Sequence, residues 1–408
     1  MTSQSPARFL DRSSPPHIFT LIVVTGLGAL SMNIFLPSLP AMAAFFEADY
    51  RLMQLSVSLY LFVNAGLQVI IGPISDRLGR RPVILGGGVL FMLATIGCLM
   101  AQSIEVFLIF RMMQAVIVTG LVLGRAVVRD MHEEAEAASQ IGYVTMGMAV
   151  VPMIGPGIGG ALEETFGWQA NFWLLLALGA AIHLLVWLDL GETAKAQTSS
   201  LREQVREYPE LLASRRFWGY CMAASFASGA FFSYLGGAPY VGSEVFGLSA
   251  AEVGLYFGAP AVGYFFGNWI SGRYSMQVGI NGMILWGSIA SAVGMGISLG
   301  LSLAGGQTAF TFFAFMTFVG LGNGMVLPNA TSGMLSVRPH LAGSASGLGG
   351  AIMLAGGGAM SLLAAALLTG DRGELPLLWI MFATAVLAVV SILYTIRREA
   401  QVSADPNP

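Results

Sequence analysis

Charge and cysteine are scarce in this chain of 408 residues. Charged side chains make up 10% of it, lysine occurs once, at Lys195, and the two cysteines are Cys98 and Cys221. Because a phosphate-binding G-x-x-x-x-G-K-[ST] loop needs a lysine after glycine, and Lys195 follows alanine, an ATP-driven machine is excluded. Both cysteines fall inside apolar stretches, so no disulfide framework is expected. No basic tract indicates nucleic acid as a partner, and neither a metal site nor a cofactor is predicted.

Apolar side chains are abundant instead. They account for 55% of the residues, and the mean hydropathy is +0.73, which is more apolar surface than a soluble domain of this size buries. A membrane-spanning helix needs roughly 20 apolar residues, and a backbone in lipid must satisfy its own hydrogen bonds. We therefore predict an all-α membrane protein with twelve transmembrane helices, at residues 17–43, 51–72, 82–101, 106–128, 139–162, 169–190, 217–238, 251–271, 283–304, 308–330, 342–368 and 377–396.

These runs form two sets of six. The predicted domains are an N-terminal six-helix half at 1–190, a cytoplasmic amphipathic linker at 191–216 and a C-terminal six-helix half at 217–408. Apolar residues recur at helical spacing in the linker, which is typical of a helix lying on the membrane surface; they are Leu201, Val205, Tyr208 and Leu212.

The distribution of Lys and Arg predicts the orientation. With the N-terminus inside, only Arg51 and Arg372 of the 19 Lys and Arg residues fall in outside loops. Cytoplasmic loops carry the excess of positive charge. We therefore predict a multi-pass protein of the cytoplasmic (inner) membrane with both termini in the cytoplasm.

The two halves resemble each other at an offset of about 200 residues. LPSLP at 36–40 ends the first run and GGAPY at 236–240 ends the seventh. Ser75-Asp76-Arg77 follows the second run, and Ser271-Gly272-Arg273 follows the eighth. A duplicated six-helix unit is the construction of transporters whose two halves rock about a site near the middle of the membrane.

A short charged stretch, GPISDRLGRRPV at 72–83, interrupts the apolar sequence between the second and third runs. We expect it to be a short hinge. It closely resembles the G-x-x-x-D-R-x-G-R-R loop signature of the major facilitator superfamily. GPGIGG at 155–160 resembles the antiporter motif of that superfamily, and SYLGGAPYVGSEVFGLS is similar to the bicyclomycin and chloramphenicol/florfenicol resistance (Bcr/CflA) group.

The resemblance implies a gate at the cytoplasmic ends of the helices. Its expected residues are Asp76, Arg77, Arg80, Arg81 and Asp130. Asp76 is expected to face the N-terminus of the eleventh span, where a carboxylate gains about 0.3–1 kcal/mol, and Arg80 to pair with Asp130. Such contacts, present in one arrangement of the halves only, bias the outward-open state; the alternative is a loop that only sets topology.

The antiporter motif consists of Gly155, Pro156, Gly159 and Gly160. Proline removes a helical hydrogen bond and glycine removes bulk, so a bend and a close approach to another helix are expected. We predict the eleventh span as that partner, because it carries Gly347, Gly349 and Gly350. Ordinary packing of small residues is the alternative role.

Arg111 lies several residues inside the fourth run, where a charge costs at least about 2.5 kcal/mol. We predict that it faces an interior cavity and a partner, in substrate binding, in coupling or as a structural hydrogen-bond hub. Tyr60, Asn64 and Gln68 recur every four residues and predict a polar stripe that faces the interior. Further candidates for binding are Asn33, Gln114, Tyr234 and Asn268; each can equally serve in helix packing.

Asn33 marks a departure from the resemblance, since many Bcr/CflA members carry a proton-exchanging aspartate at this position. An amide does not titrate in the working pH range. His183 is one substitute, because histidine changes charge near neutral pH, although a lone histidine is more often structural. Glu252 and either Glu163 or Glu164 are others, and a substrate anion held by Arg111 could also drive exchange.

The sequence thus predicts a monomeric secondary transporter, not an enzyme, that exports small amphipathic compounds or drugs, and the family resemblance implies protons as the counter-ion. A dedicated metabolite exporter or exchanger and a non-transporting membrane receptor or scaffold are the alternatives.

Overall fold

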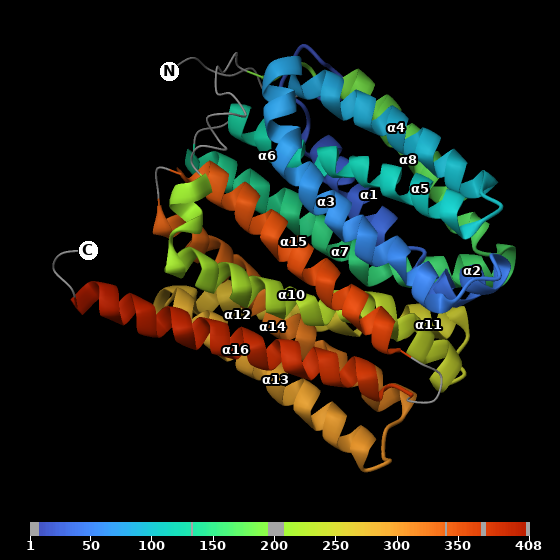
Figure 1. The fold of residues 1–408 in the computed structure, drawn as a ribbon. Coiled ribbons are helices and arrows are strands. Elements are labelled where there is room, and N and C mark those ends of the chain that lie inside the picture. The colour runs from blue at the N-terminus through green and yellow to red at the C-terminus, as the bar shows by residue number, and fades with distance from the viewer. Residues whose placement is uncertain (1–7, 132–133, 195–207, 339–340, 369–372, 405–408) are drawn as a thin grey trace.

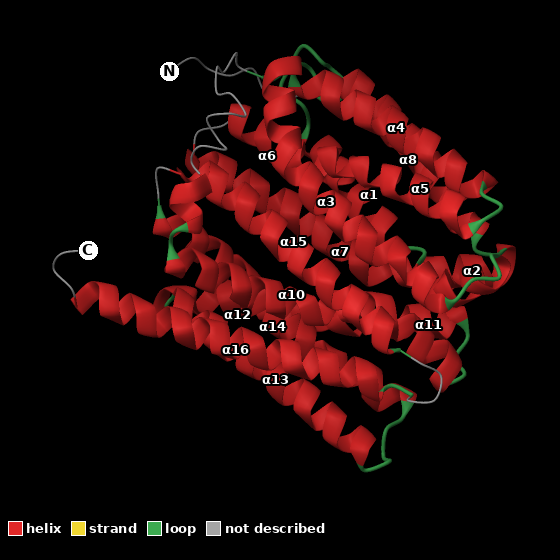
Figure 2. Ribbon diagram, viewed as in Figure 1, coloured by secondary structure: helices red, strands yellow, loops and turns green. Residues whose placement is uncertain are grey.

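A computed structural model describes residues 8–131, 134–194, 208–338, 341–368 and 373–404. Within these ranges the regular secondary structure is helical, and short loops connect the helices (Figure 2). The elements are α1 (Ile18–Asn33), η1 (Leu36–Ser38), α2 (Leu39–Phe45), α3 (Tyr50–Leu78), α4 (Arg80–Met100), α5 (Ile104–Gln114), η2 (Ala115–Ile117), α6 (Val118–Met131), α7 (Glu134–Phe166), α8 (Gln169–Asp189), α10 (Arg215–Tyr240), η3 (Val241–Val245), α11 (Ala250–Tyr256), α12 (Ala259–Val278), α13 (Ile280–Leu303), α14 (Ala309–Val337), α15 (Ala342–Leu367) and α16 (Leu375–Ala404).

The predicted spans are confirmed as helical segments. Nine segments among the described residues are long and apolar enough to cross a membrane. The other three predicted spans correspond to α7, α10 and the pair α11 and α12. Helix α10 is rich in glycine, alanine and serine and is buried over most of its length. Because its small side chains let α14, α15 and α16 approach closely, it needs little lipid-facing surface.

The short hinge expected at 72–83 is a single residue, and most of this charged stretch is helical. Helix α3 continues to Leu78 and α4 begins at Arg80, which leaves Gly79 as the one connecting residue. Gly79 has φ 95°, a conformation that side chains disfavour. Gly279 connects α12 to α13 in the same way, with φ 79°. The two turns lie 200 residues apart, at the offset of the sequence repeat.

The helices form two groups, α1 to α8 and α10 to α16, that meet along α3 and α15 and between α7 and α11 (Figure 1). One core cluster, which includes Ile34, Phe172, Val253 and Phe313, contains residues of both groups. Two further clusters each belong to one group, around Leu123 and around Val326. These two clusters lie toward the end of the molecule that carries Arg80, Arg129 and Arg338. We call it the arginine-rich end.

The groups therefore share a hydrophobic core at the end opposite the arginine-rich end. Tyr50 donates a hydrogen bond to the carbonyl of Gly236 at 2.7 Å, and its ring lies 4.9 Å from that of Tyr240. One turn further, Gln54 donates to the carbonyl of Ser361 at 3.3 Å. These contacts join the two groups at this end.

The predicted linker is described only in part, since Leu201 and Val205 lie outside the described residues. Tyr208 and Leu212 lie in a short helical stretch, and Leu212 is exposed whereas the neighbouring Leu211 is buried.

Candidate functional site

A buried arginine lies at a break in the fourth helical segment. Helix α5 ends at Gln114, the 3-10 turn η2 follows, and α6 resumes the segment. Arg111 occupies the last turn of α5, and its residue surface is 0% exposed. A full charge at such a position has to be matched by hydrogen bonds or by an opposite charge.

The guanidinium of Arg111 donates its hydrogen bonds to neutral acceptors. Its Nε donates to the carbonyl of Ser56 at 3.4 Å. Its Nη2 donates to the carbonyl of Ser31 at 3.0 Å, and its Nη1 donates to the Ser31 hydroxyl at 3.3 Å. Nη1 also donates to Gln114 Oε1 at 2.8 Å. Arg111 thereby connects α1, α3 and its own helix.

Two aromatic rings flank the same cation. Arg111 Cζ lies 4.4 Å from the ring centre of Phe35 and 4.1 Å from that of Tyr60. A cation over an aromatic face is attracted by about 2 kcal/mol or more when both groups are desolvated. No ion pair involves Arg111 in the part of the chain that the structure describes. The site is thus a buried positive charge without a carboxylate partner among the described residues.

The hydrogen-bond chain continues into α4. Gln114 Nε2 donates to Thr95 Oγ1 at 2.8 Å, and Thr95 donates to the carbonyl of Phe91 at 2.7 Å. Sequence reasoning found Arg111, Gln114 and Tyr60 but missed the groups that hold them. Ser31, Phe35 and Ser56 carry no signal by themselves, because serine and phenylalanine are common in every span.

Several buried polar atoms on α1, α3 and α10 have no hydrogen-bond partner within the described ranges. They include the hydroxyl of Ser56, whose carbonyl accepts from Arg111, Asn33 Oδ1 and, on α10, the hydroxyls of Ser233 and Tyr234. Buried polar groups are normally paired. These atoms are therefore positions at which a polar group of a bound compound could be recognised.

Asn33 is one of the remaining binding candidates. Asn33 is the last residue of α1, two residues after Ser31, so its side chain leaves the helix about 200° around from that of Ser31. Its Nδ2 donates to the carbonyl of Ala29 at 2.6 Å.

The polar stripe on α3 connects the site with α15. Gln68 Nε2 donates to Asn64 Oδ1 at 3.2 Å, and Gln68 lies against Gly350. On α10, the Tyr234 ring lies 4.7 Å from that of Phe257. Asn268 is half-buried and bonds the carbonyl of Tyr264 in its own helix.

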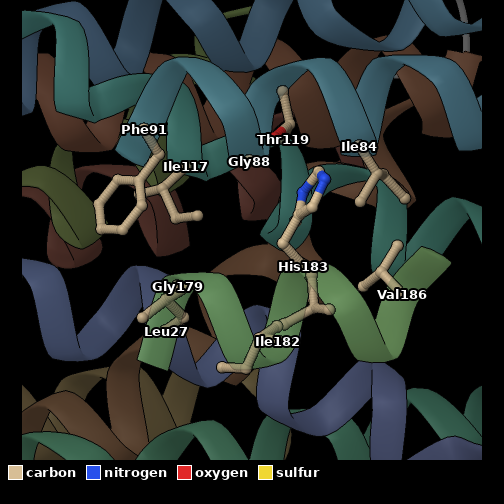
Figure 3. A pocket seen from close by; sticks show the side chains of 12 residues that line it. Leu27, Ile84, Gly88, Phe91, Ile117, Thr119, Gly179, Ile182, His183 and Val186 are labelled. Carbon is tan, nitrogen blue, oxygen red and sulfur yellow. The ribbon is translucent and has the colours of Figure 1, made fainter. Parts of the chain in front are cut away.

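His183 lies apart from Arg111, between α8 and α4. It points toward Gly88 and lines a small cavity within the first group of helices, with Thr119 as the other polar neighbour (Figure 3). The cavity measures about 30 Å³. That volume suits a water molecule, whereas pockets for drug-sized ligands measure about 300 Å³ or more.

Arg80 is the centre of the charged cluster at the arginine-rich end. Its Nη1 lies 2.5 Å from Asp76, and its Nε donates to Asp130 at 3.0 Å, as the resemblance implied. Arg81 Nε donates to the carbonyl of Leu190 at 2.8 Å, whereas Arg77 is exposed. Both ion pairs lie within the first group of helices, so they do not distinguish one arrangement of the two groups from another. The expected position of Asp76 at the eleventh span stays a prediction.

Glu192 is a member of this cluster that sequence reasoning missed. Its carboxylate accepts from the backbone N–H of Arg80 at 2.8 Å and of Arg81 at 3.2 Å. It caps the N-terminus of α4, where a negative charge is favourable.

Arg80→Ala is expected to destabilise the protein by about 3 kcal/mol, because it leaves Asp76 and Asp130 without their partner in a mostly buried position. Arg77→Ala, on an exposed side chain of the same stretch, is the matched control. Thermal unfolding in detergent measures both. Equal melting temperatures for the two variants would contradict the role of Arg80.

The predicted partner of the antiporter motif is wrong. A Cβ on Gly160 would overlap the backbone of Ala250, and one on Gly254 would overlap the carbonyl of Pro156. The motif therefore packs against α11, at the start of the eighth span, rather than against the eleventh. On another face, Gly159 abuts the carbonyl of Ile34 at the end of α1. The glycines permit backbone contact between the two groups of helices.

A family model described as Major Facilitator Superfamily matches residues 21–362. The chain belongs to the major facilitator superfamily. A solved member of similar fold is a bacterial homologue of the human lysosomal transporter Spinster, in an inward-facing and occupied conformation. It has a TM-score of 0.70 at 17% identity and covers 94% of this chain and 96% of its own. The predicted major facilitator fold is confirmed.

Curated relatives of this superfamily member have names linked to drug resistance. Multidrug resistance protein D of Escherichia coli is 28% identical and covers 88% of this chain and 91% of its own length. A chloramphenicol resistance protein of Pseudomonas aeruginosa is 31% identical, with 80% and 79% covered. A bicyclomycin resistance protein homologue of Haemophilus influenzae is 27% identical, with 95% and 98% covered. They confirm the resemblance to the Bcr/CflA group.

Proposed function

We propose that this protein exports small amphipathic compounds, antibiotics among them, from the cytoplasm by alternating access. The observation that carries the proposal is the Arg111 site, a buried cation between two aromatic rings with the unpaired hydroxyl of Ser56 on a residue that it contacts. Aromatic walls suit apolar ligand surface, and the few polar atoms suit orientation. The names of the drug-resistance relatives support the substrate class.

The proposed orientation places the arginine-rich end in the cytoplasm, in accord with the excess of arginine there. The two groups of helices then act as rocking halves, with boundaries at 1–190 and 217–408. They share a core at the outer end and have separate cores at the cytoplasmic end. The arrangement therefore corresponds to an inward-facing state, from which a substrate would enter the Arg111 site.

Proton entry is the proposed driving force, as in the exporters that the sequence resembles. One observation favours a second candidate function: Arg111 has no carboxylate partner among the described residues, which suits a metabolite anion moved by exchange. In both cases the positive site should disfavour permanent cations, since like charges repel strongly in a medium of low dielectric constant.

Growth of a drug-sensitive bacterium tests the proposal. Expression of the protein is expected to raise the inhibitory concentration of chloramphenicol several-fold, whereas a permanently cationic dye should be unaffected because Arg111 repels it. An Arg111→Ala variant at equal membrane abundance is the control. Unchanged resistance with every neutral and anionic antibiotic tested would contradict drug export and favour the metabolite exchanger.

A further inference from the structure

Glu163 lies in the last turns of α7, one helical turn beyond the contact between Gly160 and α11. Its side chain is half-buried, and its Oε2 atom is buried without a hydrogen-bond partner in the described part of the chain. Glu164, next to it, is exposed. One of two adjacent carboxylates is therefore partly enclosed, about one helical turn beyond the point where α7 contacts α11.

The groups that η1 and α8 place around Glu163 are polar but uncharged. The hydroxyl of Ser38, a fully buried residue of η1, faces the carboxyl of Glu163. Ser38 Oγ in turn accepts from Asn171 Nδ2 at 3.0 Å, and the same Nδ2 donates to the carbonyl of Gly159 at 3.2 Å. Asn171 Oδ1 is buried and unpaired. The cluster thus holds two buried oxygens, Glu163 Oε2 and Asn171 Oδ1, that can accept further hydrogen bonds, and the Ser38 hydroxyl is a donor that faces Glu163.

Protonation of Glu163 would change the number of hydrogen-bond donors in this cluster. The ionised carboxylate accepts hydrogen bonds only, whereas the protonated acid also donates one. A buried carboxylate without sufficient donors is costly, and the neutral acid avoids that cost. The enclosed position therefore favours the protonated form while the outer contact is closed.

None of the charged groups described around Glu163 stabilises its ionised form. Glu164, on the same helix, acts on it as a like charge. On α11, the carboxylate of Glu252 accepts from the backbone N–H of Ser249 at 2.9 Å. Residues 18–45 and 169–182, which include α1, η1 and the start of α8, contain no ionisable side chain.

We propose that Glu163 is a proton-binding site of the outer gate, protonated when α7 and α11 are in contact and ionised when they separate and water reaches it. The proposal rests on the transport function proposed above. Proton binding from outside would then favour closure of the outer end, a step that an antiporter requires after its substrate has left. Glu163 would also supply the titratable carboxyl that is missing at position 33, where this chain has asparagine.

Spin labels on α7 and α11 test the proposal without any substrate. Phe166 and Leu255 are 72% and 77% exposed, and Cys98 and Cys221 are buried, so labels on Phe166→Cys and Leu255→Cys report the outer gap in lipid nanodiscs. The ratio of closed to open molecules is expected to fall as pH rises from about 5 to about 8. One linked proton changes this ratio by at most tenfold per pH unit.

Glu163→Gln, which imitates the neutral acid, is expected to remain closed at every pH, whereas Glu164→Gln should follow the wild-type profile. A Glu163→Gln variant that retains the wild-type pH dependence would overturn the proposal. If the pH-dependent closure is found in a protein that moves no drug or metabolite, the proton site stands and the proposed function fails.

Discussion

Arg111→Ala is expected to reduce transport to background, by about a hundredfold or more, while the protein still inserts into the membrane. The alanine leaves Gln114 Oε1 and the carbonyl of Ser31 without their donor. A buried acceptor without a partner costs about 1–3 kcal/mol, and two such losses correspond to roughly a hundredfold. Radiolabelled drug uptake into membrane vesicles measures the effect, with the abundance of the variant determined in the same membranes.

Arg111→Lys separates charge from geometry. A lysine retains the positive charge but lacks the planar fork that reaches four acceptors between two rings. We expect this variant to transport poorly as well. Wild-type uptake by the alanine variant would remove Arg111 from the mechanism, and wild-type uptake by the lysine variant would show that charge alone matters.

Gly160→Ala is expected to slow transport about tenfold or more, because the added Cβ meets backbone atoms of α11 that cannot move aside as a side chain can. Overpacking of this kind costs about 1–3 kcal/mol. The cost falls on the state in which α7 and α11 are in contact. The outer end should therefore remain open for longer, which the spin-label distance across the outer gap detects directly.

Gly157→Ala is the matched control on the same helix. At this position the nearest atom to the new Cβ would be the carbonyl oxygen of Gly254, at 3.8 Å, which is ordinary contact. Transport should remain within about twofold of the wild type, as for most uncrowded substitutions. Equal loss of transport in both glycine variants would point to helix propensity rather than to the contact with α11.

The helices were predictable from the sequence because long apolar runs in lipid have few alternatives to the helix. The family signature also indicated the pair of Arg80 and Asp130. The extent of the charged stretch was not predictable in this way. Polar composition suggested a loop, whereas the ion pair of Asp76 with Arg80 and the single turn at Gly79 let helices occupy nearly all of it.

The site was only partly predictable because its contacts join helices far apart in the sequence. An arginine inside an apolar run is a strong signal, and so Arg111 was found. The groups that hold it are two backbone carbonyls, a serine hydroxyl, an amide and two rings, and backbone carbonyls leave no trace in a sequence. The partner of Gly160 was missed for a related reason, since glycine patterns show that a close contact exists but not with which helix.

The most direct test of the account is uptake of labelled chloramphenicol into inverted vesicles that contain the wild-type protein or Arg111→Ala, with and without an imposed pH gradient. We predict uptake by the wild type that rises when the vesicle interior is acidic, that falls when the gradient is collapsed, and that is absent in the variant. Uptake that does not respond to the gradient, or that persists without Arg111, would contradict the proton-driven export of drugs through this site.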